Sequence, residues 1–176
     1  MQREKRKVSD SMTTVARVMM PQDANISGNV FGGSVLKMVD EVAYVAATRH
    51  ARCNVVTASV DRMDFLSPVR VGDLVRLRAN VNAAWHSSME VGVRIEAEDP
   101  RTGEVRHTGS SYLTLVALGP DGKPTAVPEL LLETEEDMRR NREAMRRRAR
   151  RLEEKAVERF HGKRKSRRHP RGPKGS

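Results

Sequence analysis

The stretch from Asp23 to Ala43, DANISGNVFGGSVLKMVDEVA, holds the residues whose types could do chemistry. It joins an Asn-rich loop, a Gly-Gly pair at 32–33 and one acid, Asp40, inside an apolar segment. Free amides at a helix start, next to glycines, allow close approach by a ligand and can stabilise an oxyanion. A carboxylate at the edge of a buried surface is costly unless it is paired or its pKa is raised. The combination therefore indicates acid–base chemistry beside an oxyanion site.

Each feature also has an ordinary structural interpretation. Lys37 precedes Asp40 by three residues, so on a helix the two can form a salt bridge. The Gly-Gly pair is typical of a turn with unusual backbone angles, and Asn25 is of a type common in loops. Taken singly, none of these residues decides between the two interpretations.

Hydrophobic periodicity predicts the elements that position these residues. Gly33 to about Arg49 is predicted to be a helix that is apolar around most of its circumference, so other elements must enclose it. Segments 75–81 and 89–97 alternate apolar and polar residues with period two, as half-buried antiparallel strands do. Further strands are predicted at 13–20, 55–66 and 105–118. The predicted fold is α+β: one strand, a long helix, then four strands in a meander, with the sheet wrapped around the helix.

Composition and charge exclude several classes of protein. The 176 residues hold no run of about 18 apolar residues, which predicts no membrane span, and the charged start MQREKRKVSD is unlike a secretion signal. The single cysteine, Cys53, allows no internal disulfide and no cysteine-based zinc site, which favours a cytoplasmic location. Scattered histidines without ligand spacing predict no metal site. No serine lies in a Gly-x-Ser-x-Gly elbow, so a serine-esterase mechanism is not expected.

The positive charge is confined to the end of the chain. Residues 134–176 contain 17 of the 33 Lys and Arg residues but 7 of the 23 Asp and Glu residues, so they carry the whole net charge of +10. We expect a mobile basic N-terminus at 1–11, a domain at 12–127, a linker with a charged helix at 128–160, and a disordered basic tail at 161–176. The charged helix has a thin apolar seam, formed by Met145, Ala149, Leu152 and Ala156.

The body of the chain resembles a known enzyme family. The residues that carry the resemblance are DANISGNVFGGSVLKMVDEVA, TRH, NVVTASVDRMDFLSPVRVGD, SSMEV and GKPTAVP, and they occur in the family's order. On them the chain resembles the hot-dog fold acyl-CoA thioesterases, most closely the cytosolic (brain-type) acyl-CoA hydrolases and their bacterial single-domain relatives. The resemblance implies hydrolysis of fatty acyl-CoA to a free fatty acid and coenzyme A, without a metal or other cofactor.

The resemblance also implies roles for particular residues. Asn25 and Asp40 match the catalytic pair, with Asp40 as general base or, alternatively, as nucleophile, and the amides of Gly32 and Gly33 would hold the oxyanion. The expected site lies across a homodimer, with Asn25 of one subunit facing Asp40 of the other, and dimers would assemble further into a hexamer. The candidates for contact with coenzyme A are Val56, Thr57, Ser59, Arg62, Ser87 and Ser88.

The basic tail leaves a second interpretation open. The resemblance fades after about residue 133, and Arg-rich helices with Lys and Arg tracts can bind nucleic acid through phosphates. The alternative function is therefore a non-catalytic module that binds acyl-CoA, or nucleic acid through the tail. A solvated helix that packs its seam on the body is the plainer expectation.

Overall fold

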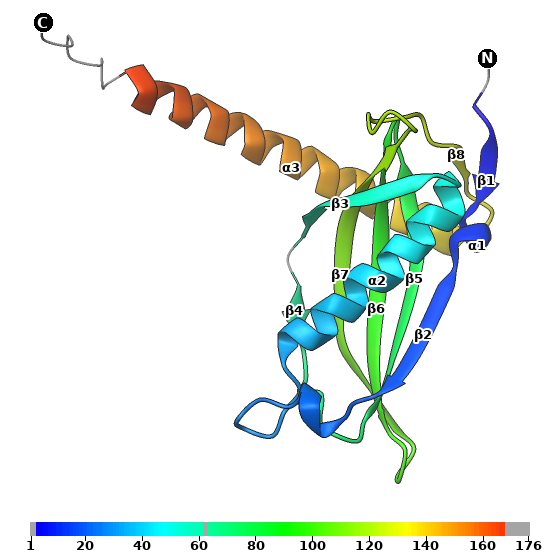
Figure 1. Ribbon diagram of the computed structural model, residues 1–176. Helices are drawn as coiled ribbons and strands as arrows, with labels where there is room; N and C mark the ends of the chain where they lie inside the picture. Colours follow the sequence, from blue (N-terminus) through cyan, green and yellow to red (C-terminus); the bar gives the residue numbers. More distant parts are fainter. Residues whose placement is uncertain (1–2, 62, 168–176) are drawn as a thin grey trace, which may run out of the picture.

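The computed structural model describes residues 3–61 and 63–167, and at its centre an antiparallel sheet curls around one long helix (Figure 1). The helical elements are α1 (Val8–Ser11), the short 3-10 turn η1 (Pro21–Asp23), α2 (Gly32–Ala51) and α3 (Glu135–Arg167). The strands are β1 (Lys5–Lys7), β2 (Thr13–Val18), β3 (Asn54–Val60), β4 (Asp64–Phe65), β5 (Leu74–Ala84), β6 (Ser88–Asp99), β7 (Glu104–Leu118) and β8 (Glu129–Leu131). The predicted α+β hot-dog fold is confirmed.

The strand order corrects one prediction. In the main sheet the order is β2-β5-β6-β7-β3, and β4 also pairs with β7. Only β5, β6 and β7 form a meander, whereas β3 pairs with β7 at the far edge instead of beside β5. Helix α2 explains the difference, because it crosses the face of the sheet and delivers the chain to the opposite edge (Figure 1). Strand β3 is therefore an edge strand of this chain.

The core lies between α2 and the inner face of the sheet. Every apolar position predicted to face inward on β5 and β6 is buried, namely Val75, Leu77, Ala79, Val81, Met89, Val91, Val93, Ile95 and Ala97. The side of α2 that faces them is equally closed, with Val39, Ala43 and Ala46 at 0% exposure. Burial of this apolar surface is the main force that holds α2 against the sheet.

The N-terminal segment differs from the expectation of a mobile lead-in. Strand β1 pairs in parallel with β8, and the one-turn helix α1 follows it. Val8 is buried, and the buried hydroxyl of Ser11 accepts a hydrogen bond from Val81 N at 2.9 Å. The described part of this segment is thus fastened to β5 and β8, which composition alone did not reveal.

Helix α3 packs on the outer face of the sheet, where a solvated face was expected. Asn141 Nδ2 donates to Asn82 O at 2.9 Å, Arg140 Nη1 donates to Asn80 Oδ1 at 3.0 Å, and Ala144 is fully buried. Beneath the helix, Glu90 of β6 is 0% exposed and forms an ion pair with Arg147 at 2.7 Å. The polar face of β6 is therefore partly a buried interface.

The predicted apolar seam is not the main face by which α3 docks. Met145 and Leu152 are 43% and 56% exposed, and Met145 contributes one contact, in which its Sδ accepts from Trp85 Nε1 at 3.4 Å. Arginines, Asn141 and Ala144 make the other contacts described above. The helix continues to Arg167, past the end predicted near 160, and its last part projects from the domain (Figure 1). Residues 168–176 of the expected disordered tail lie outside the described residues. None of the described helices is long and apolar enough to cross a membrane.

Candidate active site

The loop before α2 is held in shape by its own asparagine. Asn25 Oδ1 accepts hydrogen bonds from Ser27 N at 2.9 Å and from Asn29 N at 3.3 Å, and Asn25 N donates to Asn29 O at 2.7 Å. Gly28 takes the left-handed φ of 79° that this tight loop requires. With Oδ1 engaged in the loop, the amide nitrogen of Asn25 is the atom suited to donate to a ligand.

A second anchor joins this loop to the body. Asp23 is 7% exposed and accepts hydrogen bonds from Arg17 Nη2 at 2.5 Å and from Met20 N at 3.0 Å. The Arg17 guanidinium first, and then the Met20 amide, hold the pKa of Asp23 below its usual range. The Asp23 carbonyl accepts from Phe31 N at 2.8 Å, which fixes the residue that precedes α2.

Helix α2 begins without a side-chain cap. Its N-cap residue, Phe31, makes no side-chain cap hydrogen bond, and the Phe31 carbonyl accepts from Ser34 N and Val35 N. The amides of Gly32 and Gly33 in the first turn are thus those that can point at a ligand, with the positive end of the helix dipole behind them.

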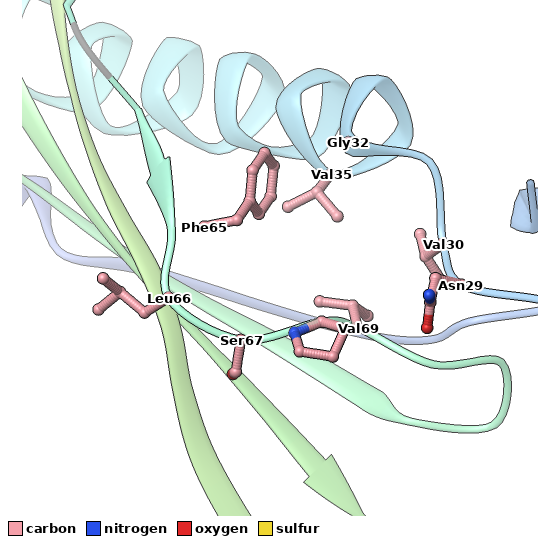
Figure 2. Close-up of a pocket in the computed structure, with 9 residues that line it drawn as sticks. Asn29, Val30, Gly32, Val35, Phe65, Leu66, Ser67 and Val69 are labelled. Atoms are coloured by element: carbon pink, nitrogen blue, oxygen red, sulfur yellow. The ribbon is translucent and has the colours of Figure 1, made fainter. Parts of the chain in front are cut away.

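A pocket of about 330 Å³ opens beside this helix start (Figure 2). Its lining is Asn29, Val30, Gly32, Val35, Phe65, Leu66, Ser67, Pro68 and Val69. The Phe65 ring lies under the first turn, so close that a Cβ on Gly32 would be 3.2 Å from it. Gly32 is needed for this approach, and Phe65, which the sequence did not single out, forms a wall of the pocket.

Asp40 lies on an exposed face of α2 and has a specific partner. Thr57 Oγ1, on β3, donates to Asp40 Oδ1 at 2.7 Å. Lys37, which was considered as a salt-bridge partner of Asp40, instead has its Nζ 3.8 Å from Glu41 Oε1. A carboxylate oriented by a hydroxyl, with its other oxygen toward solvent, can accept a proton from water.

The structure brings together some of the predicted residues and separates others. Gly32 lines the pocket, while Asn25 and Asp40 do not line it within one chain. Val56 and Ser59 lie on β3 with Thr57, the partner of Asp40. Ser88 begins β6, and the carbonyl of Ser87 before it accepts from Ala117 N at 2.9 Å; neither serine lines the pocket. Arg62 lies outside the described residues.

One role of Thr57 could not be predicted from the sequence. Thr57 is a predicted contact of coenzyme A, and in the structure it is also the hydrogen-bond donor to Asp40. Neither hydrophobic periodicity nor sequence spacing predicts a contact between residues 40 and 57, because this hydrogen bond depends on how α2 packs beside β3.

Among the described residues no group of three or more His, Cys, Asp or Glu could hold a metal ion.

Comparison with known proteins decides the family. The model of the Thioesterase superfamily matches residues 27–104. The uncharacterized acyl-CoA thioester hydrolase YkhA of Bacillus subtilis is 39% identical over 135 residues, which are 77% of this chain and 78% of the relative. The chain belongs to the hot-dog acyl-CoA thioesterase family.

Solved structures of this family agree with the fold. An apo-hexameric acyl-CoA thioesterase has 40% identity and a TM-score of 0.84, over 88% of this chain and 99% of the other. The acyl-CoA hydrolase of Staphylococcus aureus, in complex with butyryl coenzyme A, coenzyme A and coenzyme A disulfide, has 36% identity and a TM-score of 0.79. That alignment covers 90% of this thioesterase and 99% of the S. aureus chain. The prediction of an enzyme of the thioester hydrolase class is confirmed.

Proposed function

We propose that this thioesterase hydrolyses fatty acyl-CoA to a free fatty acid and coenzyme A in the cytoplasm, with Asp40 as general base. The observation that carries this function is the 2.7 Å hydrogen bond from Thr57 to Asp40 on an exposed face of the helix whose first amides are uncapped. The substrate class is supported by the S. aureus relative, whose complex holds butyryl coenzyme A. The reaction as written needs no cofactor, and coenzyme A enters only as part of the substrate.

The proposed steps follow from the donor and acceptor atoms. The thioester carbonyl oxygen lies against the Gly32 and Gly33 amides, which stabilise the negative charge as it develops. Asp40 takes a proton from water, the water oxygen attacks the carbonyl carbon, and the carbon–sulfur bond breaks. Coenzyme A leaves as a thiolate, and the protonated Asp40 returns its proton to the sulfur. Asn25 Nδ2 donates a hydrogen bond to the water or the carbonyl.

We place the complete site across a homodimer, with Asn25 of one subunit facing Asp40 of the other. In the single chain, two exposed apolar side chains of α2 lie one helical turn to either side of Asp40: Leu36 at 38% and Tyr44 at 45% exposure. A patch of this kind is typical of a surface that a partner covers. The hexameric relative supports further assembly into a trimer of dimers.

Release of free thiol from a panel of acyl-CoAs tests the function directly. We expect turnover by the wild-type protein and loss of turnover in both Asp40→Asn and Asn25→Ala. Mixing these two inactive variants should restore part of the activity, because some mixed dimers contain one intact site. Binding of acyl-CoA without thiol release would instead favour a non-catalytic module, and no recovery in the mixture would place both residues in one subunit.

A further inference from the structure

Helix α3, on the outer face of the sheet, contacts the residue that follows β3. Arg151 Nη1 lies 2.5 Å from Asp61 Oδ2, and the two side chains are only 16% and 13% exposed. Asp61 is the residue directly after β3, and its backbone N donates to Tyr112 O of β7 at 2.8 Å. Two contacts, one from α3 and one from β7, therefore fix the point where the edge strand ends.

Arg151 is itself held by a buried acid. Its Nη1 and Nη2 atoms both lie 3.4 Å from Glu90 Oε2, and Glu90 is 0% exposed. The other oxygen of Glu90 accepts from Arg147 Nη2 at 2.7 Å, and Arg147 stacks over the Tyr112 ring at 3.6 Å. A planar guanidinium held in this way has little rotational freedom, so Arg151 is a firm anchor for Asp61.

Strand β3 depends on such an anchor. As an edge strand it bonds to β7 alone in this sheet, and its register shifts between Thr57 and Ser59. A bulge bends a strand and interrupts its ladder. Thr57, the donor to Asp40, lies at this irregular point, four residues before Asp61.

We propose that Arg151 is a positioning residue of the hydrolytic site. Through Asp61 it fixes the end of β3, and so it keeps Thr57 against Asp40. This role rests on the proposed function of Asp40. It makes the charged C-terminal helix part of the catalytic apparatus instead of a solvated appendage.

Arg151→Gln is the direct test, with Arg150→Gln as the matched control. Arg150 is the adjacent residue; its side chain is 67% exposed, and its Nε lies 3.9 Å from Glu154 Oε1 on the same helix. We expect kcat per folded molecule to fall about tenfold or more in Arg151→Gln, because a misplacement of about 1 Å can lower turnover about 100-fold. Arg150→Gln should keep the wild-type kcat, and Arg151→Lys should recover part of the loss.

A double variant separates positioning from a general loss of stability. In a Thr57→Val background the hydroxyl is gone, so Arg151→Gln should add little further loss of kcat. A full additional tenfold loss there would overturn the role. If Arg151→Gln does not fold, Asp61→Ala removes the oxygen that Arg151 contacts and keeps the backbone N–H, and wild-type kcat in that variant would also overturn the role. Failure of the proposed function is seen separately, as turnover that survives Asp40→Asn.

Discussion

Two carboxylates of this thioesterase, Asp40 and Glu90, show how one fold uses the same group in opposite ways. Glu90 is fully buried on the outer face of β6 and has Arg147, Arg151 and Asn82 as partners. Asp40 is exposed on α2 and accepts a hydrogen bond from the Thr57 hydroxyl. An acid whose acceptor sites are filled by cations holds structure together, while an acid oriented by one neutral donor keeps capacity for a proton.

The two acids also differ in how far the chain covers their surroundings. Around Glu90 the partner element, α3, belongs to the same chain and covers the acid completely. Around Asp40 the apolar neighbours Leu36 and Tyr44 are 38% and 45% exposed in the single chain. The surface around Glu90 is thus covered by the chain itself. The surface around Asp40 remains exposed in the single chain, as our proposal of a substrate and a second subunit at this place requires.

Asp40→Asn gives the largest effect that we expect. The amide cannot take a proton from water, so kcat should fall by about 10²- to 10⁴-fold, as when a general base is lost. The thermal midpoint should hardly change, because Asp40 is exposed and Asn can still accept the Thr57 hydrogen bond. Thiol release and thermal unfolding measure the two quantities. A variant with near-normal kcat, or one that loses activity only because it unfolds, would remove Asp40 from the mechanism.

Glu90→Gln should lower the free energy of unfolding, which Asp40→Asn leaves nearly unchanged. It leaves Arg147 and Arg151, which are 14% and 16% exposed, without their shared carboxylate. Breaking a buried ion pair by removing one partner costs about 3–5 kcal/mol, and we expect about 3 here because both arginines retain other acids. Urea unfolding measures this loss of stability.

Glu136→Gln is the control for Glu90→Gln. Glu136 pairs with Arg139 and Arg140 on the exposed first turns of α3, where solvent screens the charges. Its substitution should leave the free energy of unfolding near the wild-type value. Equal losses in the two variants would mean that burial of Glu90 contributes nothing.

The sequence predicted the parts of the fold that periodicity encodes. Alternation on β5 and β6 named their buried faces correctly, and the apolar segment after Gly33 predicted α2 to within two residues at each end. Periodicity could not show that β3 pairs with β7, because strand order depends on how α2 crosses the sheet. It also could not show that α3 docks by arginines, since Arg147 and Arg151 look like a solvated face until Glu90 lies beneath them.

For the site, the sequence named the residue types and missed their contacts. Gly32 was singled out as a close-approach position, and the pocket and Phe65 ring beside it are consistent with that role. The Thr57–Asp40 hydrogen bond joins residues far apart in the chain, so no local pattern signals it. The roles of Asn25 and Asp40 stay predictions, because they concern two subunits and one chain carries half of each proposed site.

Gly32→Ala tests the contact between the start of α2 and the Phe65 ring, and we expect a smaller effect from it. The added Cβ would be 3.2 Å from the Phe65 ring, so the ring must shift by a few tenths of an ångström. We expect KM to rise about fivefold, equivalent to about 1 kcal/mol of overpacking, with a smaller change in kcat. Phe65→Leu in the same chain should relieve the contact. A double variant with a higher KM than both single variants would show that the two residues do not meet.

His50 gives the smallest effect, on stability at acid pH. The ring is 0% exposed, and Nε2 lies 3.0 Å from Pro128 O. Burial lowers the pKa of His50 from 6.5, so the unfolded chain binds the proton more tightly than the folded chain. Its contribution to stability is therefore complete above about pH 6.5 and is lost as the pH falls through the folded-state pKa, by at most about 1.4 kcal/mol per pH unit.

His50→Gln removes this titration and keeps a donor for the Pro128 carbonyl. Between pH 7.5 and 5, its free energy of unfolding should fall less steeply than that of the wild-type protein, in urea titrations at each pH. His86→Gln, at an exposed position in the β5–β6 turn, is the control and should keep the wild-type slope. Identical slopes in all three proteins would mean that His50 is protonated equally in the folded and unfolded states. A steeper dependence of the free energy of unfolding on pH in the wild-type protein would show that His50, in the last turn of α2, causes part of the loss of stability at acid pH. That position is separate from both Asp40 and Glu90.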